Sequence, residues 1–323
     1  MPHDAHLLLL DGPTVLKGLS PEAVLVAVRE AFTLHSERAG RVFPLIREKL
    51  HTGGVFGIKA GDVSRQNLLG FKAAGFWPTN RQRGGEPHQA TVMLFDPETG
   101  RPLCLMDGNA ITSERTGAAG GLGLQLLARK DSERLCVFGT GVQARVQVRY
   151  ALRALPSIRQ VQYVSFDGQS DATFEGAFQG LCDVKVARDR NEAVAASDVV
   201  ITATPGGGAL FEAEAVQAGT HLNCVGSDTV GKRELPPGVL ERSRVFVDDA
   251  EQARNIGEGQ WARDLSVTEL GDLLTARVTF SRDRSAITVF DMTGIALQDL
   301  TVARMLYEFA TSSGHGTSVP WPW

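Results

Sequence analysis

The residues best suited to chemistry include a glycine-rich run near the middle of the chain. It reads Gly139-Thr140-Gly141-Val142-Gln143-Ala144 and matches the pattern G-x-G-x-x-G/A. Gly139 permits a tight turn, Gly141 lets the backbone approach a pyrophosphate, and Ala144 lets the following helix pack closely. The first N–H groups of that helix would then point at the phosphates. On its own, the pattern fits an ordinary strand-to-helix turn equally well.

The flanking segments favour the dinucleotide interpretation. Arg134–Phe138 predicts a buried strand before the glycines, and Val161–Phe166 predicts the next strand after an intervening helix. Asp167 follows that second strand, about twenty positions past the glycine run, where an acid binds the ribose 2′-hydroxyl of a dinucleotide. Because a carboxylate there repels a 2′-phosphate, the sequence predicts NAD(H) and not NADP(H) as the cofactor.

Two further strands are expected at 183–187 and 198–203. The second of them ends in Thr202-Ala203-Thr204, followed by Pro205 and Gly206. Ligands of open α/β sheets lie at the carboxyl ends of the strands, so we expect Thr202, Ala203 and Thr204 to face the nicotinamide half of the cofactor. Strand, glycine turn, helix, strand and acid in this order predict a nicotinamide-dinucleotide domain.

Outside the glycine run, three basic residues and one acid could bind a substrate. Arg47, taken alone, reads as a surface or salt-bridged arginine. Lys72 lies in apolar surroundings, where an amine needs a partner or a function and can move protons at a lowered pKa. Arg115 stands near a predicted helix start, where a bound anion or solvent must offset the helix dipole. Asp228, after a strand predicted at 221–225, fits a turn aspartate as well as a catalytic one.

Composition excludes several classes of function. The 323 residues are 43% hydrophobic, enough for two domains, and carry a net charge of −4 without a basic block. We therefore expect no nucleic-acid or membrane partner. Leu7–Leu10 is too short for a membrane span or a signal core. The four widely spaced cysteines predict reduced, buried thiols in a cytoplasmic protein, with no disulfide framework and no metal site.

The elements that must position these residues follow from local patterns. Ser20 and Pro21 predict a helix start, and the apolar stripe between Ala23 and Phe32 is core or a subunit contact. Candidate strands then follow at 42–50, 55–59, 68–75, 89–95 and 102–106, the last two joined as a hairpin. A helix should run from Asn109–Ser113 to about Lys130. The last helix is expected over Ala296–Thr311, with a tail from Ser312 that is either extended or docked on a neighbouring molecule.

Six short motifs, in order, resemble those of the ornithine cyclodeaminase/mu-crystallin family. They are 43–47 (FPLIR), 70–72 (GFK) with 78–80 (PTN), 112–116 (TSERT), 139–143 (GTGVQ), 225–228 (VGSD) with 231–235 (GKREL), and 290–296 (FDMTGIA). The resemblance implies an α/β fold in which a Rossmann dinucleotide-binding domain is inserted in a mixed α/β substrate-binding and dimerisation domain. The expected boundaries are 1–117 with 297–323 for the substrate domain and 118–296 for the NAD-binding domain. It also implies a substrate cleft between the lobes and a homodimer.

The resemblance also assigns roles to single residues. Arg47, Lys72 and Arg115 match cations that hold the substrate α-carboxylate, and Asp228 matches the acid facing the substrate nitrogen. The residues matching the cofactor site are Thr116, Gly139, Thr140, Gly141, Val142, Gln143, Asp167, Thr202, Ala203, Thr204, Ser227 and Gly294. Asp291, Asp299, His88 and His221 are interpreted as structural residues.

Three functions remain open on the sequence. The favoured one is an NAD(H)-dependent reductase of a small imino acid, or an amino-acid dehydrogenase such as one acting on alanine. A redox-neutral cyclodeaminase that releases ammonia comes second, and a crystallin-like binding protein without turnover third. The run 69–78 and the strand 88–92 are most similar to members that reduce iminosuccinate to L-aspartate. Lys59 could then bind the second carboxylate, or it could point to solvent.

Overall fold

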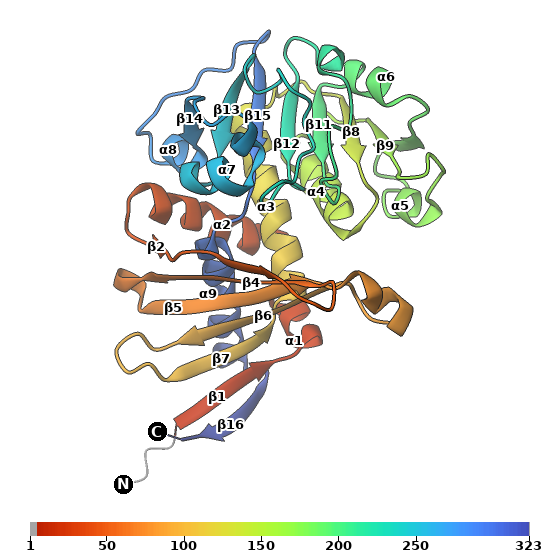
Figure 1. Ribbon diagram of the computed structural model, residues 1–323. Coiled ribbons are helices and arrows are strands. Elements are labelled where there is room, and N and C mark those ends of the chain that lie inside the picture. Colours follow the sequence, from red (N-terminus) through yellow and green to blue (C-terminus); the bar gives the residue numbers. More distant parts are fainter. Residues whose placement is uncertain (1–4, 323) are drawn as a thin grey trace. The chain divides into compact units, whose positions relative to one another are not determined.

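A computed structural model describes residues 5–322 (Figure 1). The contacts divide the chain into two compact units, Met1–Arg115 with Ile295–Trp323 and Thr116–Gly294. We refer to the first as the terminal unit, because it holds both ends of the chain, and to the second as the central unit. The chain passes from one to the other within helix α3 (Asn109–Leu127) and again between Gly294 and Ile295.

The terminal unit is built on one mixed sheet. In sheet order its strands are β16 (Thr317–Trp321), β1 (Ala5–Leu10), β7 (Pro102–Asp107), β6 (His88–Phe95), β5 (Leu68–Phe76), β4 (Val55–Val63) and β2 (Arg41–Val42), with β3 (Ile46–Lys49) also paired to β4. The pairs between β4 and β7 are antiparallel, whereas β1 runs parallel to β7. The predicted hairpin joins β6 to β7 and is confirmed.

One face of this sheet is covered by helices. Side chains on that face, such as Val92 and Leu94, are buried, while Phe71 and Met93 on the opposite face are only half-buried. Helix α9 (Ala296–Ser313) packs on β4, β5 and β6, and it lies behind these strands in Figure 1. At Gly70 an added Cβ would lie 2.4 Å from the Met93 carbonyl oxygen and 2.9 Å from Leu300 Cδ2, so only glycine fits there.

The predicted helix after Ser20 is α2 (Pro21–Ser36), and its start is confirmed. The Ser20 hydroxyl oxygen accepts the Ala23 N–H at 3.1 Å, and Pro21 occupies the first turn. The apolar stripe is buried from Val24 onward, with Val28 and Phe32 fully buried, and α2 packs on α9. This stripe therefore forms core of the terminal unit. Helix α1 (Gly12–Gly18) precedes α2 and was not predicted.

Two expectations for the terminal unit need correction. The single strand expected at 42–50 is broken into β2 and β3, because Pro44 has no N–H to offer a ladder. Strand β4 continues to Val63, beyond the predicted end at Lys59. The tail is extended, which is one of the two forms expected for it: β16 pairs antiparallel with β1, a strand that was not predicted. Short 3₁₀ turns occupy Ser64–Gln66 and Pro78–Arg83.

The central unit carries a parallel sheet wound outward from its first strand. In sheet order its strands are β10 (Asp183–Val186), β9 (Gln160–Val164), β8 (Arg134–Phe138), β11 (Val199–Thr202), β12 (His221–Cys224), β15 (Ile287–Asp291), β13 (Ser243–Val247) and β14 (Val267–Glu269). Because the chain starts at β8 and turns back to β11, the direction of winding reverses between these two strands. This is the Rossmann topology, which binds dinucleotides at that reversal.

Besides the part of α3 from Thr116 onward, the helices of the central unit are short apart from the one after the glycine run. They are α4 (Val142–Ala154), α5 (Ala172–Gly176), α6 (Arg190–Ala195), α7 (Ala250–Ile256) and α8 (Leu270–Leu274), with 3₁₀ turns at Ala213–Ala215 and Glu258–Trp261. Strands β11, β12 and β15 are buried along their whole length, as expected for a sheet covered on both faces. The expected strand ending at Phe166 stops at Val164, and helix α3 ends at Leu127 and not at Lys130.

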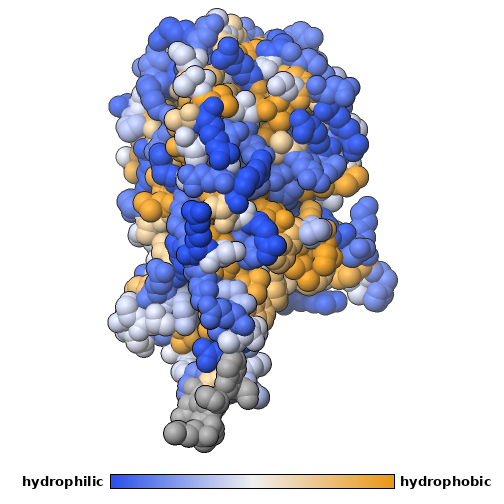
Figure 2. Space-filling model, turned by 90° about the vertical axis from the view of Figure 1, so that its left-hand side faces the viewer, coloured by the Kyte–Doolittle hydropathy of each residue, from blue (hydrophilic) through white to orange (hydrophobic). Residues whose placement is uncertain are grey.

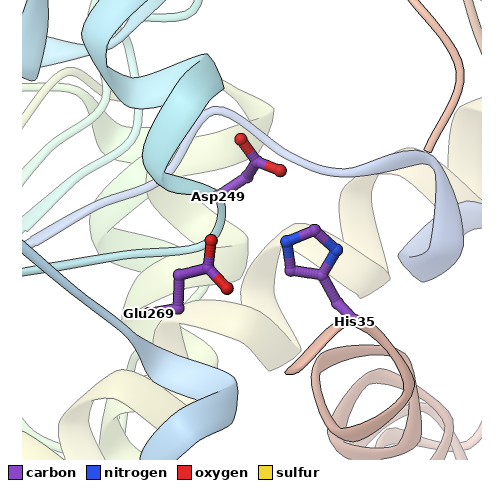
Figure 3. Close-up of side chains that lie close together, drawn as sticks. All are labelled: His35, Asp249 and Glu269. Atoms are coloured by element: carbon purple, nitrogen blue, oxygen red, sulfur yellow. The ribbon is translucent and has the colours of Figure 1, made fainter. Parts of the chain in front are cut away.

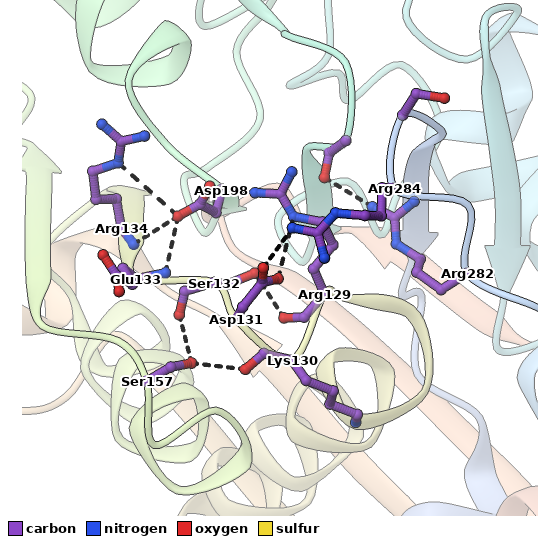
Figure 4. Close-up of polar contacts among 12 residues, drawn as sticks. Arg129, Lys130, Asp131, Ser132, Glu133, Arg134, Ser157, Asp198, Arg282 and Arg284 are labelled. Carbon is purple, nitrogen blue, oxygen red and sulfur yellow. Dashed lines mark hydrogen bonds and ion pairs between the residues drawn. The ribbon is translucent and has the colours of Figure 1, made fainter.

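A polar network fixes the amino-terminal edge of this sheet (Figure 4). The Asp198 carboxylate accepts the N–H groups of Glu133 and Arg134 at 2.9 and 3.0 Å and pairs with Arg129. Asp198 precedes β11, and the two N–H groups lie at the start of β8. One carboxylate therefore aligns the two strands between which the winding reverses. The Asp131–Arg284 pair in the same network is largely exposed.

Acids also fix the start of α7 at the carboxyl edge (Figure 3). Asp249 caps the helix by accepting the Gln252 N–H at 2.7 Å, and Glu269 at the end of β14 accepts the Ala250 N–H at 3.2 Å. Both contacts satisfy N–H groups that a helix start leaves without intrahelical partners.

Two further observations concern burial. Cys104, Cys136 and Cys224 are buried free thiols as predicted, but Cys182 is only half-buried. Burial raises the pKa of Cys104 to about 12. Among residues 5–322, no helix combines the length and the apolar character that crossing a membrane requires.

Candidate functional site

The glycine run forms the turn from β8 into α4. Gly139 has a φ of 98°, and an added Cβ would lie 2.7 Å from the Ala203 carbonyl oxygen, so only glycine fits. Gly141 is the N-cap of α4 without a side-chain cap, and the space beside it is open. Ala144 is fully buried against the sheet, whereas Val142 is exposed. The turn therefore presents uncapped N–H groups and an open approach, which suits a pyrophosphate.

A pocket of about 410 Å³ opens beside this turn. Its lining consists of Thr140, Ser165, Phe166, Asp167, Gln169, Ser170, Asp171 and Ala172. Asp167 is exposed and accepts the Gln169 N–H at 3.0 Å, so its carboxylate keeps room for a second donor. Phe166 is fully exposed at the same rim, where a planar ring could stack. Asp171, which the sequence analysis did not single out, caps α5 by accepting the Phe174 N–H at 2.9 Å.

The predicted nicotinamide contacts lie at the carboxyl ends of β11, β12 and β15. Thr202 is fully buried and its hydroxyl donates to Glu234 at 2.7 Å, so its side chain serves the protein's own packing. The buried Ser227 hydroxyl donates to the Lys232 carbonyl at 3.1 Å. Gly294 has a φ of 77° and its N–H donates to Asp248. Hydrogen bonds to buried groups therefore fix the three loops that begin at these strand ends. Ala203 and Thr204 lie on the first of these loops, directly after Thr202.

Two more predicted residues occupy this unit. Thr116 is a buried residue of α3, and its carbonyl accepts from Gln147 Nε2 at 2.8 Å. Asp228 lies in the loop after β12, where its carboxylate pairs with Lys232 Nζ at 2.7 Å. About a third of each of these two side chains is exposed, so a ligand can reach the acid. Lys232, which was not predicted as a site residue, partly offsets the negative charge of Asp228.

In the terminal unit, three predicted cations surround one acid. Lys59 of β4 is directly opposite Lys72 of β5 in the antiparallel register. Lys72 Nζ and Arg115 Nε donate to the same Asp299 oxygen at 2.8 and 3.0 Å. Gln298 accepts from Arg115 at 3.2 Å. We call Lys59, Lys72 and Arg115 the cation cluster; all three are less than 10% exposed.

The cation cluster carries more positive charge than Asp299 can neutralise. Burial, and then the charge of Arg115, lower the pKa of Lys72 to about 7. Burial alone would raise the pKa of Asp299, but Arg115 and Lys72 outweigh it and the pKa is lowered. Asp299 is therefore a carboxylate, and Lys72 and Arg115 together, when both are charged, carry one more positive charge than it can neutralise. Buried charge of one sign favours binding of an anion.

Arg47 and His88 lie on the same sheet face as the cation cluster. In the strand register Arg47 is opposite Gly57, on the same strand as Lys59, and His88 is opposite Phe76, on the same strand as Lys72. Because alternate residues of a strand point to the same face, Arg47 and His88 lie on the face that carries Lys59 and Lys72. Between them this face bears only small residues, Gly57, Ala74 and Ala90. Burial and the charge of Lys72 lower the pKa of His88, whose Nδ1 lies 3.1 Å from Asn109 Oδ1. It contributes no charge near neutral pH.

The terminal unit thus brings together Lys59, Lys72 and Arg115, with Arg47 on the strand next to Lys59. The predicted dinucleotide residues and Asp228 lie in the central unit. Lys59 is buried and does not point to solvent. Asp299, which the sequence indicated to be structural, pairs with Lys72 and Arg115, and Glu234 was not predicted as a site residue. The Asp299 signal was a lone acid near the start of an apolar helix. His221 is a hydrogen-bonded core histidine as predicted, held by Thr288 and Asn223.

Comparison with known proteins gives the family. The model of the ornithine cyclodeaminase/mu-crystallin family matches residues 15–314. The chain belongs to this family. It is 34% identical over 304 residues to the iminosuccinate reductase of Paracoccus denitrificans, which covers 92% of this chain and 94% of that protein. The predicted family is thereby confirmed.

Solved structures of the family share the whole fold. An archaeal alanine dehydrogenase dimer with bound NAD superposes with a TM-score of 0.91 at 31% identity, over 98% of this chain and 100% of the other. The Paracoccus denitrificans iminosuccinate reductase in complex with NAD+ gives a TM-score of 0.90 at 31% identity, with the same coverage. The predicted fold class, a Rossmann domain inserted in a mixed α/β domain, is confirmed.

We predict that the cation cluster binds a dicarboxylate more weakly as the pH rises above about 7. Lys72, with a pKa of about 7, carries its charge below that pH and loses it above. The dissociation constant of succinate, measured by calorimetry, should therefore rise about tenfold per pH unit above neutrality. Lys72→Met should bind succinate weakly without this slope, whereas a variant of the exposed Lys185, Lys185→Met, should keep it. A pH-independent dissociation constant in the unmodified protein would contradict the assignment.

Proposed function

We propose that the protein is an NAD(H)-dependent reductase that converts a small imino acid into an L-amino acid. The carrying observation is that two buried cations, Lys72 and Arg115, share the single carboxylate of Asp299 beside a sheet face whose neighbouring positions are small. Such a site suits a compact substrate with at least one carboxylate. The proposed substrate is iminosuccinate, which has two carboxylates and yields L-aspartate.

The cofactor half of the proposal rests on the central unit. Two features support the fit: the conformation and contacts of Gly139 admit only glycine, and the uncapped start of α4 lies beside open space. We assign the pyrophosphate to the run 139–143, the adenosine ribose to Asp167, and the nicotinamide to the loops of Thr204, Ser227 and Gly294. The bound dinucleotide supplies a hydride from nicotinamide C4 to the substrate α-carbon.

The terminal unit would hold the substrate. Lys72, Arg115 and Arg47 bind the α-carboxylate, since guanidinium and ammonium groups donate charge-assisted hydrogen bonds to both oxygens. Lys72 can also exchange a proton, because its pKa of about 7 leaves both forms populated at neutral pH. With Asp299 fixing Lys72 and Arg115, the substrate meets groups that are already oriented.

Asp228 would act on the substrate nitrogen. A protonated imine accepts the hydride at its carbon and becomes an amine. The amine nitrogen then takes up a proton to give the ammonium group of the product. A carboxylate stabilises both the iminium and the ammonium charge, and Lys232 holds that carboxylate at 2.7 Å. We assign the cofactor and Asp228 to a domain of residues 118–296, and the substrate carboxylate to a domain of residues 1–117 with 297–323.

We further propose that the active form is a homodimer through the sheet of the terminal unit. The sheet face away from α9 bears half-buried apolar residues, among them Phe56, Ile58, Phe71, Met93 and Leu105. Figure 2 shows hydrophobic residues gathered on the surface of the molecule. Isologous dimers commonly cover such faces. Sedimentation at micromolar concentration should give a dimer, and a monomer would refute this arrangement.

We predict a preference for NADH over NADPH, because Asp167 and Asp171 line the same pocket and both repel a 2′-phosphate. Asp167→Ser combined with Gln169→Arg should raise the NADPH-to-NADH ratio of kcat/KM by at least about tenfold. Asp183→Asn removes an exposed acid outside the pocket and should leave the ratio unchanged. Better use of NADPH by the unmodified protein would show that Asp167 is misassigned.

The substrate itself is tested by oxidation of NADH with ammonia and a panel of 2-oxo acids. Oxaloacetate should support turnover far better than pyruvate or glyoxylate, by about a hundredfold or more, because a substrate with one carboxylate cannot make the contacts that we assign to Lys59. Lys59→Met should reduce the difference in turnover between oxaloacetate and pyruvate, mainly by slowing the reaction of oxaloacetate.

Two results would overturn this assignment. Faster turnover of pyruvate would exclude a role for Lys59 in binding a second carboxylate and would favour an alanine dehydrogenase. Release of ammonia from a diamino acid without accumulation of NADH would instead identify a cyclodeaminase.

A further inference from the structure

Glu234 is a fully buried carboxylate with four donors. Its Oε2 accepts the Thr202 hydroxyl at 2.7 Å and the Gly226 N–H at 2.8 Å. Its Oε1 accepts the N–H and the hydroxyl of Thr204 at 2.7 and 2.6 Å. The residue has no exposed surface. A carboxylate with this many donors is rigidly placed, since each donor restricts it in a different direction.

The donors belong to two different loops. Thr202 and Thr204 end β11 and begin the loop that follows it, whereas Gly226 follows β12. At Gly226 an added Cβ would lie 2.2 Å from the Thr204 carbonyl oxygen and 2.5 Å from Glu234 Oε1, so the two loops meet closely over the carboxylate. Neighbouring parallel strands end here, at the edge of the sheet that binds ligands.

Backbone hydrogen bonds of Arg233 and Glu234 fix the end of the loop that carries Asp228. Arg233 N–H donates to the Gly206 carbonyl at 3.2 Å, Gly208 N–H donates to the Arg233 carbonyl at 3.0 Å, and Leu210 N–H donates to the Glu234 carbonyl at 2.9 Å. The Glu234 N–H donates to Glu258 at 2.6 Å. The segment 232–235 is therefore fixed on both sides, and Ser227 and Asp228 lie on the loop between two anchored ends.

We propose that Glu234 is a positioning residue that sets the nicotinamide end of the cofactor site, acting through the Thr204 loop and the loop of Ser227 and Asp228. The inference rests on the proposed binding of NAD(H) by the central unit. It assigns Glu234 no contact with cofactor or substrate. The pyrophosphate turn at 139–141 and the pocket of Asp167 receive no hydrogen bond from Glu234 within the described residues.

This separation predicts that a change at Glu234 alters the affinity for NADH but not the affinity for ADP-ribose. ADP-ribose fills the pyrophosphate turn and the adenosine pocket, whereas NADH adds the nicotinamide. A residue that orders only the nicotinamide loops should affect NADH and leave ADP-ribose unchanged. A residue needed merely for stability should affect both ligands together or neither.

The test measures dissociation constants of NADH and ADP-ribose for Glu234→Gln. The amide keeps one oxygen but points an NH₂ group at either the Gly226 or the Thr204 N–H, so one loop loses its acceptor. We expect NADH to bind at least about tenfold more weakly and ADP-ribose to bind within about twofold of the unmodified protein. Thr202→Val, which removes one donor and keeps the carboxylate, should shift NADH in the same direction by less; it serves as the test if Glu234→Gln does not fold.

Asp198→Asn is the matched control. It alters a carboxylate that also accepts backbone N–H groups, at the opposite edge of the same sheet. It should lower the melting temperature without separating NADH from ADP-ribose. Equal loss of both ligands in Glu234→Gln, or no loss of either, would overturn the positioning role. If the unmodified protein binds ADP-ribose and NADH with no measurable affinity, the proposed cofactor fails first, and the role of Glu234 with it.

Discussion

The ion pairing of Asp299 is the interaction on which the terminal unit depends. This carboxylate has no exposed surface and accepts from Lys72 at 2.8 Å and from Arg115 at 3.0 Å. It joins β5, α3 and α9, which are far apart in the sequence, so the seating of α9 on the sheet and the orientation of the cations are decided together. Breaking such a buried pair costs about 3–5 kcal/mol, because the remaining charge stays buried without its partner. The positive charge that Asp299 leaves on Lys72 and Arg115 is the basis of the proposed binding of a substrate carboxylate.

The central unit uses buried acids for a different purpose. Asp248 accepts from the Thr293 hydroxyl at 2.8 Å and from the Gly294 N–H, and Asp291 accepts the Gly259 N–H at 3.0 Å. Burial and the neighbouring Asp291 raise the pKa of Glu258 to about 8, and burial raises the pKa of Asp291 to about 7. These carboxyl groups crowd beneath the loops at the carboxyl edge because each loop has N–H groups that no strand can satisfy. The same backbone requirement thus explains why acids gather under a site that would bind an anionic cofactor.

Much of the secondary structure could be predicted because apolar runs of strand length alternate with turns. The failures have identifiable causes. Pro44 splits a strand that hydrophobicity alone left continuous, and β1 was missed because a strand so near the chain start gains its partners only from Cys104–Met106 and from the carboxyl-terminal tail. Local patterns carry no information about a partner three hundred residues away. The formal net charge of −4 likewise conceals a local excess of positive charge around Asp299.

The sequence by itself determined the dinucleotide turn, because its requirements are local. Gly139 must adopt a positive φ, Ala144 must be small, and Asp167 must follow the next strand, and all three conditions are visible within thirty consecutive residues. Only the tertiary structure decided which side chains oppose one another. The β4–β5 register places Lys59 beside Lys72, and the packing of α9 brings Asp299 to Lys72 and Arg115. Glu234 gained its role in the same way, from two loops that meet only after parallel strands align. Charge pairing between distant segments depends on register and packing, which no single stretch of sequence specifies.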